Sequence, residues 1–164
     1  MKIRKAMRSD IGAVMAIFDY ARKFMQMSGN GSQWGAGYPS ESIIMRDIEC
    51  GNSYVCTADN GEIVATFCFV IATDSTYNKI YNGKWLNDNP YGVVHRLAKL
   101  SKVGGVANFC LQWCFEQCEN IRVDTHKDNI IMQNIFKQNG YVECGTIIIE
   151  DGSFRTAFQK TKTL

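Results

Sequence analysis

The chain has 164 residues, of which 46% are hydrophobic, 21% charged and 12% aromatic, and its formal net charge is +2. This length and composition predict one globular domain, 1–164, and exclude a disordered chain. The small charge, with no run of more than two basic residues, argues against a nucleic-acid partner, and no apolar run reaches the ~18–20 residues of a membrane span.

The first half of the chain is predicted to form a strand, two helices and a hairpin. Ser9 and Asp10 offer N-cap chemistry to the first helix, and Ser40 starts the second. Asp-Asn-Gly at 59–61 is typical of a hairpin turn, because Asn and Gly tolerate positive φ. The expected strands cover 2–7, 54–58 and 63–72, and the expected helices cover 10–27 and 40–50, with a glycine-rich loop at 28–39.

The second half begins with an irregular aromatic segment and continues as alternating strands and helices. Asp128 is the expected N-cap of the last helix, Gly140 its end, and Asp-Gly at 151–152 a closing turn. The strand-helix-strand unit 91–125 should be parallel and right-handed, which gives an α/β fold with a mixed sheet. The expected strands cover 91–98, 121–125, 141–149 and 154–160, and the expected helices cover 105–119 and 128–139.

Seven cysteines with no C-x-x-C pair indicate free thiols in a reducing compartment, so a cytoplasmic protein is expected. Cys110, Cys114 and Cys118 recur at helical spacing. The outer two would lie ~12 Å apart along a helix, whereas zinc thiolates each lie ~2.3 Å from the ion. We therefore predict helix packing and no metal site.

The most informative stretch, 93–107, ends a strand, passes through Gly104 and Gly105 and begins a helix. The first amides of a helix have no internal acceptor and carry partial positive charge, so this geometry suits phosphate or pyrophosphate. The alternative is a plain strand-to-helix turn. Neither G-x-x-x-x-G-K-[ST] nor a G-x-G-x-x-G after a strand occurs, which argues against a P-loop enzyme and a dinucleotide fold.

In this stretch the chain resembles the GCN5-related N-acetyltransferase (GNAT) superfamily, most clearly over 95–141. The family's acyl-CoA loop has Gln or Arg, two residues, Gly, one residue, then Gly or Ala. Here 102–107 reads Lys-Val-Gly-Gly-Val-Ala, with Lys102 in place of the usual Arg or Gln. The resemblance implies a single domain with a mixed, mostly antiparallel sheet, helices on both faces and a splayed central strand.

The resemblance also implies acetyl-CoA as cosubstrate. Phe136 stands where the family often has a Tyr that protonates the leaving thiolate, and phenylalanine has no proton to give. Backbone amides of 103–107 would hold the pyrophosphate, and strand 93–98 the pantetheine arm. The remaining residues implied to bind acetyl-CoA are Leu97, Ala98, Lys99, Lys102, Val103, Gly104, Gly105, Val106, Ala107 and Asn129.

On the acceptor side, the amine must lose a proton before it attacks, so a base is useful. His95 is the candidate for this base. The alternative is that His95 lies at the sheet edge and has no catalytic role. Asp124 and His126 share a face of the predicted strand, but without a nucleophile elbow they indicate strand-end and capping residues, not a hydrolase. Four loop aromatics either line an acceptor pocket or cover the edge of the core: Trp34, Tyr38, Trp85 and Tyr91.

The expected function is transfer of an acetyl group from acetyl-CoA to an amine of a small molecule or a peptide. The alternatives are a non-catalytic acyl-CoA-binding module and an interaction protein of the same fold. No membrane association, signal peptide or nucleic-acid partner is expected, and the resemblance makes a homodimer possible.

Overall fold

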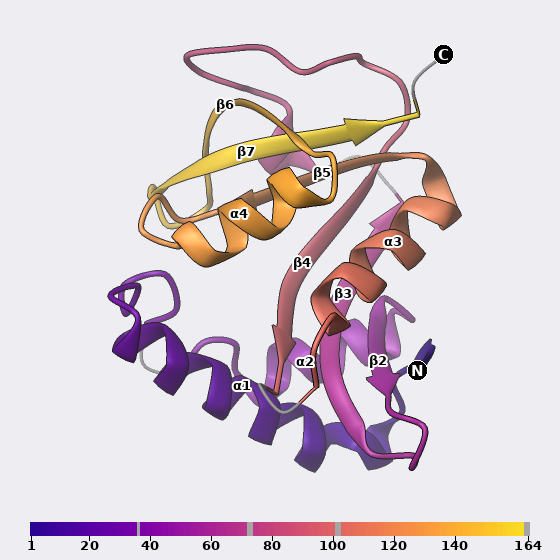
Figure 1. Cartoon of the computed structure of the whole chain (residues 1–164). Helices are drawn as coiled ribbons and strands as arrows, with labels where there is room; N and C mark the ends of the chain where they lie inside the picture. Colours follow the sequence, from indigo (N-terminus) through magenta and orange to yellow (C-terminus); the bar gives the residue numbers. More distant parts are fainter. Residues whose placement is uncertain (36, 72–73, 101–102, 163–164) are drawn as a thin grey trace. The chain divides into compact units, whose positions relative to one another are not determined.

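The computed structural model describes residues 1–35, 37–71, 74–100 and 103–162 (Figure 1). The predicted order of helices and strands is confirmed. No helix in the described ranges is both long and apolar enough to cross a bilayer. The elements are β1 Lys2–Lys5, α1 Ile11–Met27, α2 Glu41–Glu49, β2 Ser53–Thr57, β3 Ile63–Ile71, β4 Gly92–Lys99, α3 Val106–Cys118, β5 Asn120–Thr125, α4 Ile130–Gln138, β6 Val142–Ile148 and β7 Phe154–Thr161.

The chain forms two compact units, each described by itself. The first contains Met1–Phe69 and His95–Cys110, and the second contains Val70–Val94 and Leu111–Leu164. Strand β4 and helix α3 therefore each contribute residues to both. The expectation of a single domain stays a prediction.

In the first unit, β1, β2 and β3 pair antiparallel in that order. Val55 and Cys56 are neighbours in β2 and therefore point to opposite faces of the sheet. Val55 packs in the core with residues of α1 and α2, whereas the Cys56 thiol is hydrogen-bonded to Cys110 of α3. Helices thus cover both faces here, as expected. The buried core of the first face is Ala6, Val14, Ile17, Phe18, Ile44, Val55 and Ala98.

In the second unit the strand order is β4-β5-β7-β6. The start of β4 runs parallel to β5, with Gly92 opposite Ile121 and Val93 opposite Arg122. The other two pairings are antiparallel. The sheet is therefore mixed and mostly antiparallel, as predicted, and the splaying of the central strand stays a prediction. Figure 1 shows α4, in orange, beside β7. The ring centre of Phe136 in α4 lies 5.4 Å from that of Phe158 in β7 and 5.6 Å from that of Tyr141.

The opposite face of this sheet is covered by the connection 74–91 and not by a helix. Arg122 of β5 is the anchor, and its side chain is only 5% exposed. Its guanidinium lies 4.2 Å from the ring centre of Trp85 and 4.0 Å from that of Tyr91. It also donates a 2.7 Å hydrogen bond to the carbonyl oxygen of Asn87. The irregular segment is thus held on the sheet by one buried cation between two aromatic rings.

Two local predictions near α4 were wrong. The N-cap is Asn129, whose side-chain oxygen accepts a 3.1 Å hydrogen bond from the Met132 amide. The carboxylate of Asp128 instead forms an ion pair with the ammonium of Lys127, at 3.0 Å. Strand β5 ends at Thr125, so His126 lies outside it and strand alternation does not place it on the face of Asp124.

Asp10 is the N-cap residue of α1, as predicted, but its side chain makes no capping hydrogen bond there. Its carboxylate does not cap α1 but accepts a 2.8 Å hydrogen bond from the Met7 amide, across a short 3-10 turn. Both carboxylate oxygens accept from Arg4, at 2.6 and 3.0 Å. These hydrogen bonds hold the pKa of Asp10 below its ordinary value, and those from Arg4 contribute most. The residue ties β1 to the start of α1.

We predict that Asp10→Asn lowers the free energy of unfolding by about 1–3 kcal/mol at neutral pH, because a bidentate charged hydrogen bond is lost. The folded pKa of Asp10 is depressed, so this contribution is present above the ordinary carboxyl pKa of ~4 and is lost as the pH falls through the folded value. Urea unfolding between pH 7 and pH 2 measures it. Asp19→Asn, in an exposed ion pair with Arg22, should cost less than about 0.5 kcal/mol.

We predict that Arg122→Met costs about 2–4 kcal/mol, because buried carbonyl oxygens lose their donor and two aromatic rings lose the cation between them. In this variant, amide hydrogen exchange should become faster over 74–91 before it becomes faster in β7. An equal rise in exchange across the whole second unit would contradict the assignment of Arg122 as the anchor of this connection.

Candidate functional site

The most unusual backbone position of β4 is Arg96, which has a φ of 53°. A positive φ is uncommon outside glycine and costs on the order of 1–3 kcal/mol, so the surroundings must hold it in place. It also interrupts the period of two along the strand. The shared face predicted for His95 and Leu97 therefore does not follow from strand alternation.

Two elements of the first unit hold the Arg96 side chain. The guanidinium is hydrogen-bonded to the carboxylate of Asp47 in α2, and the two side chains are 15% and 16% exposed. It also donates to the hydroxyl of Tyr38 at 3.4 Å. The Arg96 Nε atom is buried and makes no hydrogen bond. A largely buried ion pair thus fixes the strained residue of β4.

The loop that carries two of the predicted acceptor residues is part of the same arrangement. The carbonyl oxygen of Tyr38 accepts a 3.0 Å hydrogen bond from Arg22 of α1. Its ring lies 6.2 Å from that of Trp34, which lies 5.6 Å from Phe18 in the core. Tyr38 is 38% exposed. The structure therefore brings Trp34 and Tyr38 together beside Arg96, with Tyr38 still open to solvent.

The predicted pyrophosphate loop lies at the start of α3. Gly104 and Gly105 are exposed, and a Cβ atom built on either would meet no atom within 4 Å. Gly105 has a φ of 72°, which favours glycine. Val106 and Ala107 are buried at 0% and 5% exposure. The first two residues of α3 are therefore buried, while the two glycines that precede them are exposed.

The residues leading to this loop are in the same unit. Ala98 is 4% exposed and belongs to the core beneath α1 and α2. His95 and Leu97 are half-buried. The Lys99 ammonium donates to the carbonyl oxygen of Leu100 at 3.3 Å. Lys102 lies outside the described residues, so the structure does not bear on its predicted contact with the cosubstrate.

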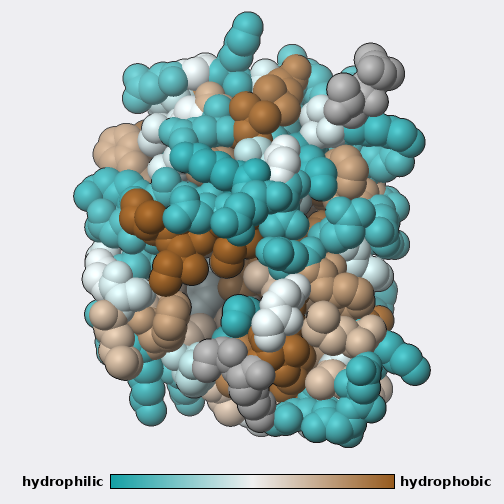
Figure 2. All heavy atoms as spheres, viewed as in Figure 1, coloured by the Kyte–Doolittle hydropathy of each residue, from teal (hydrophilic) through white to brown (hydrophobic). Residues whose placement is uncertain are grey.

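The other predicted residues lie in the second unit. Asn129 caps α4 as described above, and Phe136 is 4% exposed, with its ring 5.6 Å from Tyr141 and 5.4 Å from Phe158. The first turn of α4 exposes Ile130 and Ile131, at 57% and 45%, and Figure 2 shows apolar residues, in brown, over this helix. Asn129 thus begins a helix whose first turn is apolar and open.

Trp85 and Tyr91 have mainly structural contacts. Besides enclosing Arg122, the Trp85 indole donates to the carbonyl oxygen of Tyr77 at 3.0 Å, and the Tyr91 hydroxyl donates to that of Asp74 at 3.4 Å. Tyr91 is only 9% exposed. Of the two readings left open by the sequence, the structure therefore shows core coverage for both, and their contact with an acceptor stays a prediction.

Sequence reasoning missed the polar groups that organise these regions. The sequence pattern did not single out Asp47, and nothing in the strand pattern marked Arg96 as left-handed. It also missed the fully buried Tyr77, whose hydroxyl donates to Asp124 at 2.5 Å, and whose pKa is raised by burial and by that carboxylate. Among the described residues, no group of three or more His, Cys, Asp or Glu side chains is placed to hold a metal ion.

Comparison with solved structures gives matches over nearly the whole chain. A GNAT-family acetyltransferase from Streptococcus agalactiae is 32% identical, with a TM-score of 0.89, over 99% of this chain and 96% of that one. A GNAT-family acetyltransferase from Listeria monocytogenes is 15% identical, with a TM-score of 0.68, over 97% and 93%. A ribosomal-protein-alanine N-acetyltransferase from Brucella melitensis is 16% identical, with a TM-score of 0.67, over 98% and 99%. No family model and no curated protein sequence matches the chain.

We predict that Asp47→Asn lowers the free energy of unfolding by about 1–3 kcal/mol, because it leaves the Arg96 guanidinium buried without its countercharge. Glu49→Gln in the same helix is the matched control: its ion pair with Arg8 is exposed and should be worth less than about 0.5 kcal/mol. Urea unfolding of both variants measures the difference. Equal losses of unfolding free energy in the two variants would contradict the stabilising role assigned to the Arg96–Asp47 pair.

Proposed function

Because the chain belongs to the GNAT family of acetyltransferases, we propose that it transfers an acetyl group from acetyl-CoA to an amine of a small molecule or a peptide. The observation that carries the choice of donor is the open start of α3. Its two glycines leave the first helical amides accessible, and such amides with the helix dipole bind phosphate groups well. We assign the CoA pyrophosphate to the amides of 103–107.

The left-handed residue of β4 supports the position of the pantetheine arm. A residue that breaks the pleat cannot pair regularly on both sides of the strand, which leaves backbone groups for another partner. The amide and carbonyl groups of Leu97, Ala98 and Lys99 follow immediately after Arg96. We propose that they pair with the pantetheine arm and align the thioester along β4.

The proposed chemistry is direct transfer. The neutral amine nitrogen attacks the thioester carbonyl carbon, the carbon–sulfur bond breaks, and the CoA thiolate leaves. His95, directly or through water, takes the proton of the acceptor ammonium. As the amide forms, the nitrogen loses its second proton, and because Phe136 has no proton to give, this proton reaches the CoA thiolate through water. The main contribution of the protein is then to hold the two reactants together, which can supply ~7–11 kcal/mol of the barrier.

On the acceptor side we propose that Trp34 and Tyr38 contact the substrate. Their rings lie together, and the Tyr38 hydroxyl is hydrogen-bonded to Arg96 of β4. An acceptor packed on these rings would lie next to the proposed donor strand. We also propose that the protein acts in the cytoplasm, in keeping with its free cysteines.

A specific observation favours a second candidate, an acyl-CoA-binding protein without turnover. Phe136 is buried in an aromatic cluster with Tyr141 and Phe158, and burial raises the pKa of the Tyr141 hydroxyl in that cluster, which makes it a weak proton donor for a leaving thiolate. Binding and turnover must therefore be measured separately.

For binding, we predict that acetyl-CoA and CoA, but not ATP, raise the Tm by roughly 5–10 °C at 100 times their Kd. Gly104→Val should abolish most of this shift while leaving the Tm of the free protein within about 2 °C, because the new side chain meets no protein atom but covers the amides. Gly12→Ala, also in open space, is the control. No shift with CoA would contradict both candidates.

For turnover, release of free CoA thiol is followed with a panel of small amines and a peptide that begins with alanine. His95→Gln should lower kcat at least about tenfold with little change in the KM for acetyl-CoA, as loss of a general base does. CoA binding without thiol release across the panel would favour the binding protein instead.

A further inference from the structure

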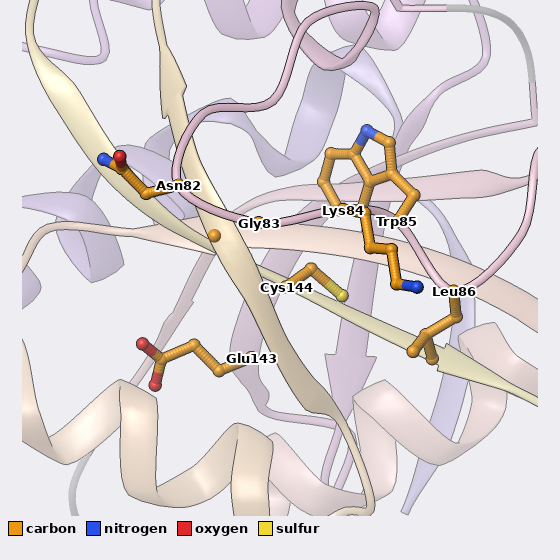
Figure 3. Close-up of a pocket in the computed structure, with 8 residues that line it drawn as sticks. Asn82, Gly83, Lys84, Trp85, Leu86, Glu143 and Cys144 are labelled. Atoms are coloured by element: carbon orange, nitrogen blue, oxygen red, sulfur yellow. The ribbon is translucent and has the colours of Figure 1, made fainter.

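The second unit contains a hollow of about 540 Å³ that the proposed function does not use. It lies between the loop segment 82–86 and the irregular part of β6 at 143–145. Figure 3 shows Lys84, Trp85 and Leu86 carried by the loop, and Cys144 carried by β6. The volume falls within the ~300–1,000 Å³ range of small-molecule pockets. None of the segments assigned to acetyl-CoA lines it.

The two walls are fixed to each other. Before the hollow, Tyr81 and Thr146 exchange two backbone hydrogen bonds of 2.8 Å. After it, the Leu86 amide donates to the side-chain oxygen of Gln159 at 2.7 Å. Between these points, a Cβ atom on Gly83 would lie 1.9 Å from the carbonyl oxygen of Cys144, so only glycine allows this approach. The shape of the hollow is therefore fixed by contacts within the protein, which lowers the entropy cost of binding.

The charge available in the hollow is positive. Within the described ranges, no acid forms an ion pair with the exposed Lys84 ammonium. The acid that lines the hollow, Glu143, is already paired with Lys137 of α4 at 3.3 Å. Behind the wall, the buried guanidinium of Arg122 is close enough to act on the Cys144 thiol, and its Nε atom makes no hydrogen bond. An anion would therefore find an unpaired cation and no free acid.

The rest of the lining is apolar or weakly polar. Leu86 is 47% exposed although its backbone amide is held by the side chain of Gln159. The Trp85 indole N–H is already donated to the carbonyl oxygen of Tyr77, so the tryptophan offers its ring rather than a donor. Cys144 is 6% exposed, and burial raises the pKa of its thiol, which keeps it neutral. These groups suit the hydrocarbon part of a ligand.

We propose that this hollow is a binding site for a small organic anion with an aromatic or aliphatic body, such as an arylalkyl carboxylate. The carboxylate pairs with Lys84, and the body packs on Trp85 and Leu86 over Cys144. No residue that lines the hollow is among those assigned to acetyl-CoA, so the proposal can be tested whether or not the proposed function holds.

The test is a titration of the ¹⁵N-labelled protein with 4-phenylbutyrate, followed by amide chemical shifts, with and without saturating CoA. We expect saturable shifts centred on 82–86 and 143–145 in both conditions. The uncharged amide, 4-phenylbutyramide, should bind about tenfold more weakly. Lys84→Gln should weaken binding of the carboxylate about three- to fivefold, as loss of an exposed ion pair does. Lys79→Gln, on the same loop but outside the hollow, should leave the affinity for the carboxylate unchanged.

Three results would overturn the proposal: shifts that map to other residues, shifts that do not saturate, or equal binding of the carboxylate and the amide. Because Lys84 is exposed, its substitution should leave the fold intact, and the unaltered spectrum of the free variant verifies this. The comparison of the two ligands on the wild-type protein tests the requirement for an anion independently of any variant.

Discussion

The ion pair between Arg96 and Asp47 is the interaction on which the proposed donor strand depends. A left-handed arginine in the middle of a strand is unfavourable by itself, and it persists because α2 supplies the countercharge and Tyr38 supplies a hydrogen bond. The same guanidinium therefore fixes the backbone of β4 and one of the aromatic rings proposed for the acceptor. Reactants held by such a framework are aligned by packing and backbone geometry, which suits a reaction that needs proximity more than a strong acid or base.

Regular elements and tight turns could be predicted because their causes are local. Apolar spacing predicted α1 and α3, and capping and stop residues predicted α2 and α4, each to within a few residues. Ser40 does cap α2, and the turns at Gly61 and Gly152 have the positive φ expected of glycine. The cap of α4 was assigned one residue early, to Asp128 instead of Asn129. Two adjacent residues with similar capping chemistry compete for that position, and only the path of the preceding chain decides between them.

The candidate site was less predictable because its organising contacts are distant in sequence. Trp85 and Tyr91 looked like pocket aromatics, but the cation that they enclose, Arg122, lies on a different strand. The left-handed conformation of Arg96 has no signal either, since Gly, Asn and Asp are the usual residues there. By contrast, the exposure of Gly104 and Gly105 at the start of α3 has a local cause, since neither residue has a side chain, while their part in binding an anion stays a prediction.

The bridge between Tyr81 and Thr146 has a consequence for the behaviour of the protein at high concentration. Strand β6 is the last strand in its order, and an unprotected outer strand presents a row of amides and carbonyls to which another chain can add. The irregularity between Glu143 and Gly145 breaks that row, and the connection 74–91 occupies part of what remains. The segment that Arg122 holds on the sheet thus also covers part of this outer strand, so its detachment would expose the edge of β6 to pairing with another chain before the rest of the unit unfolds.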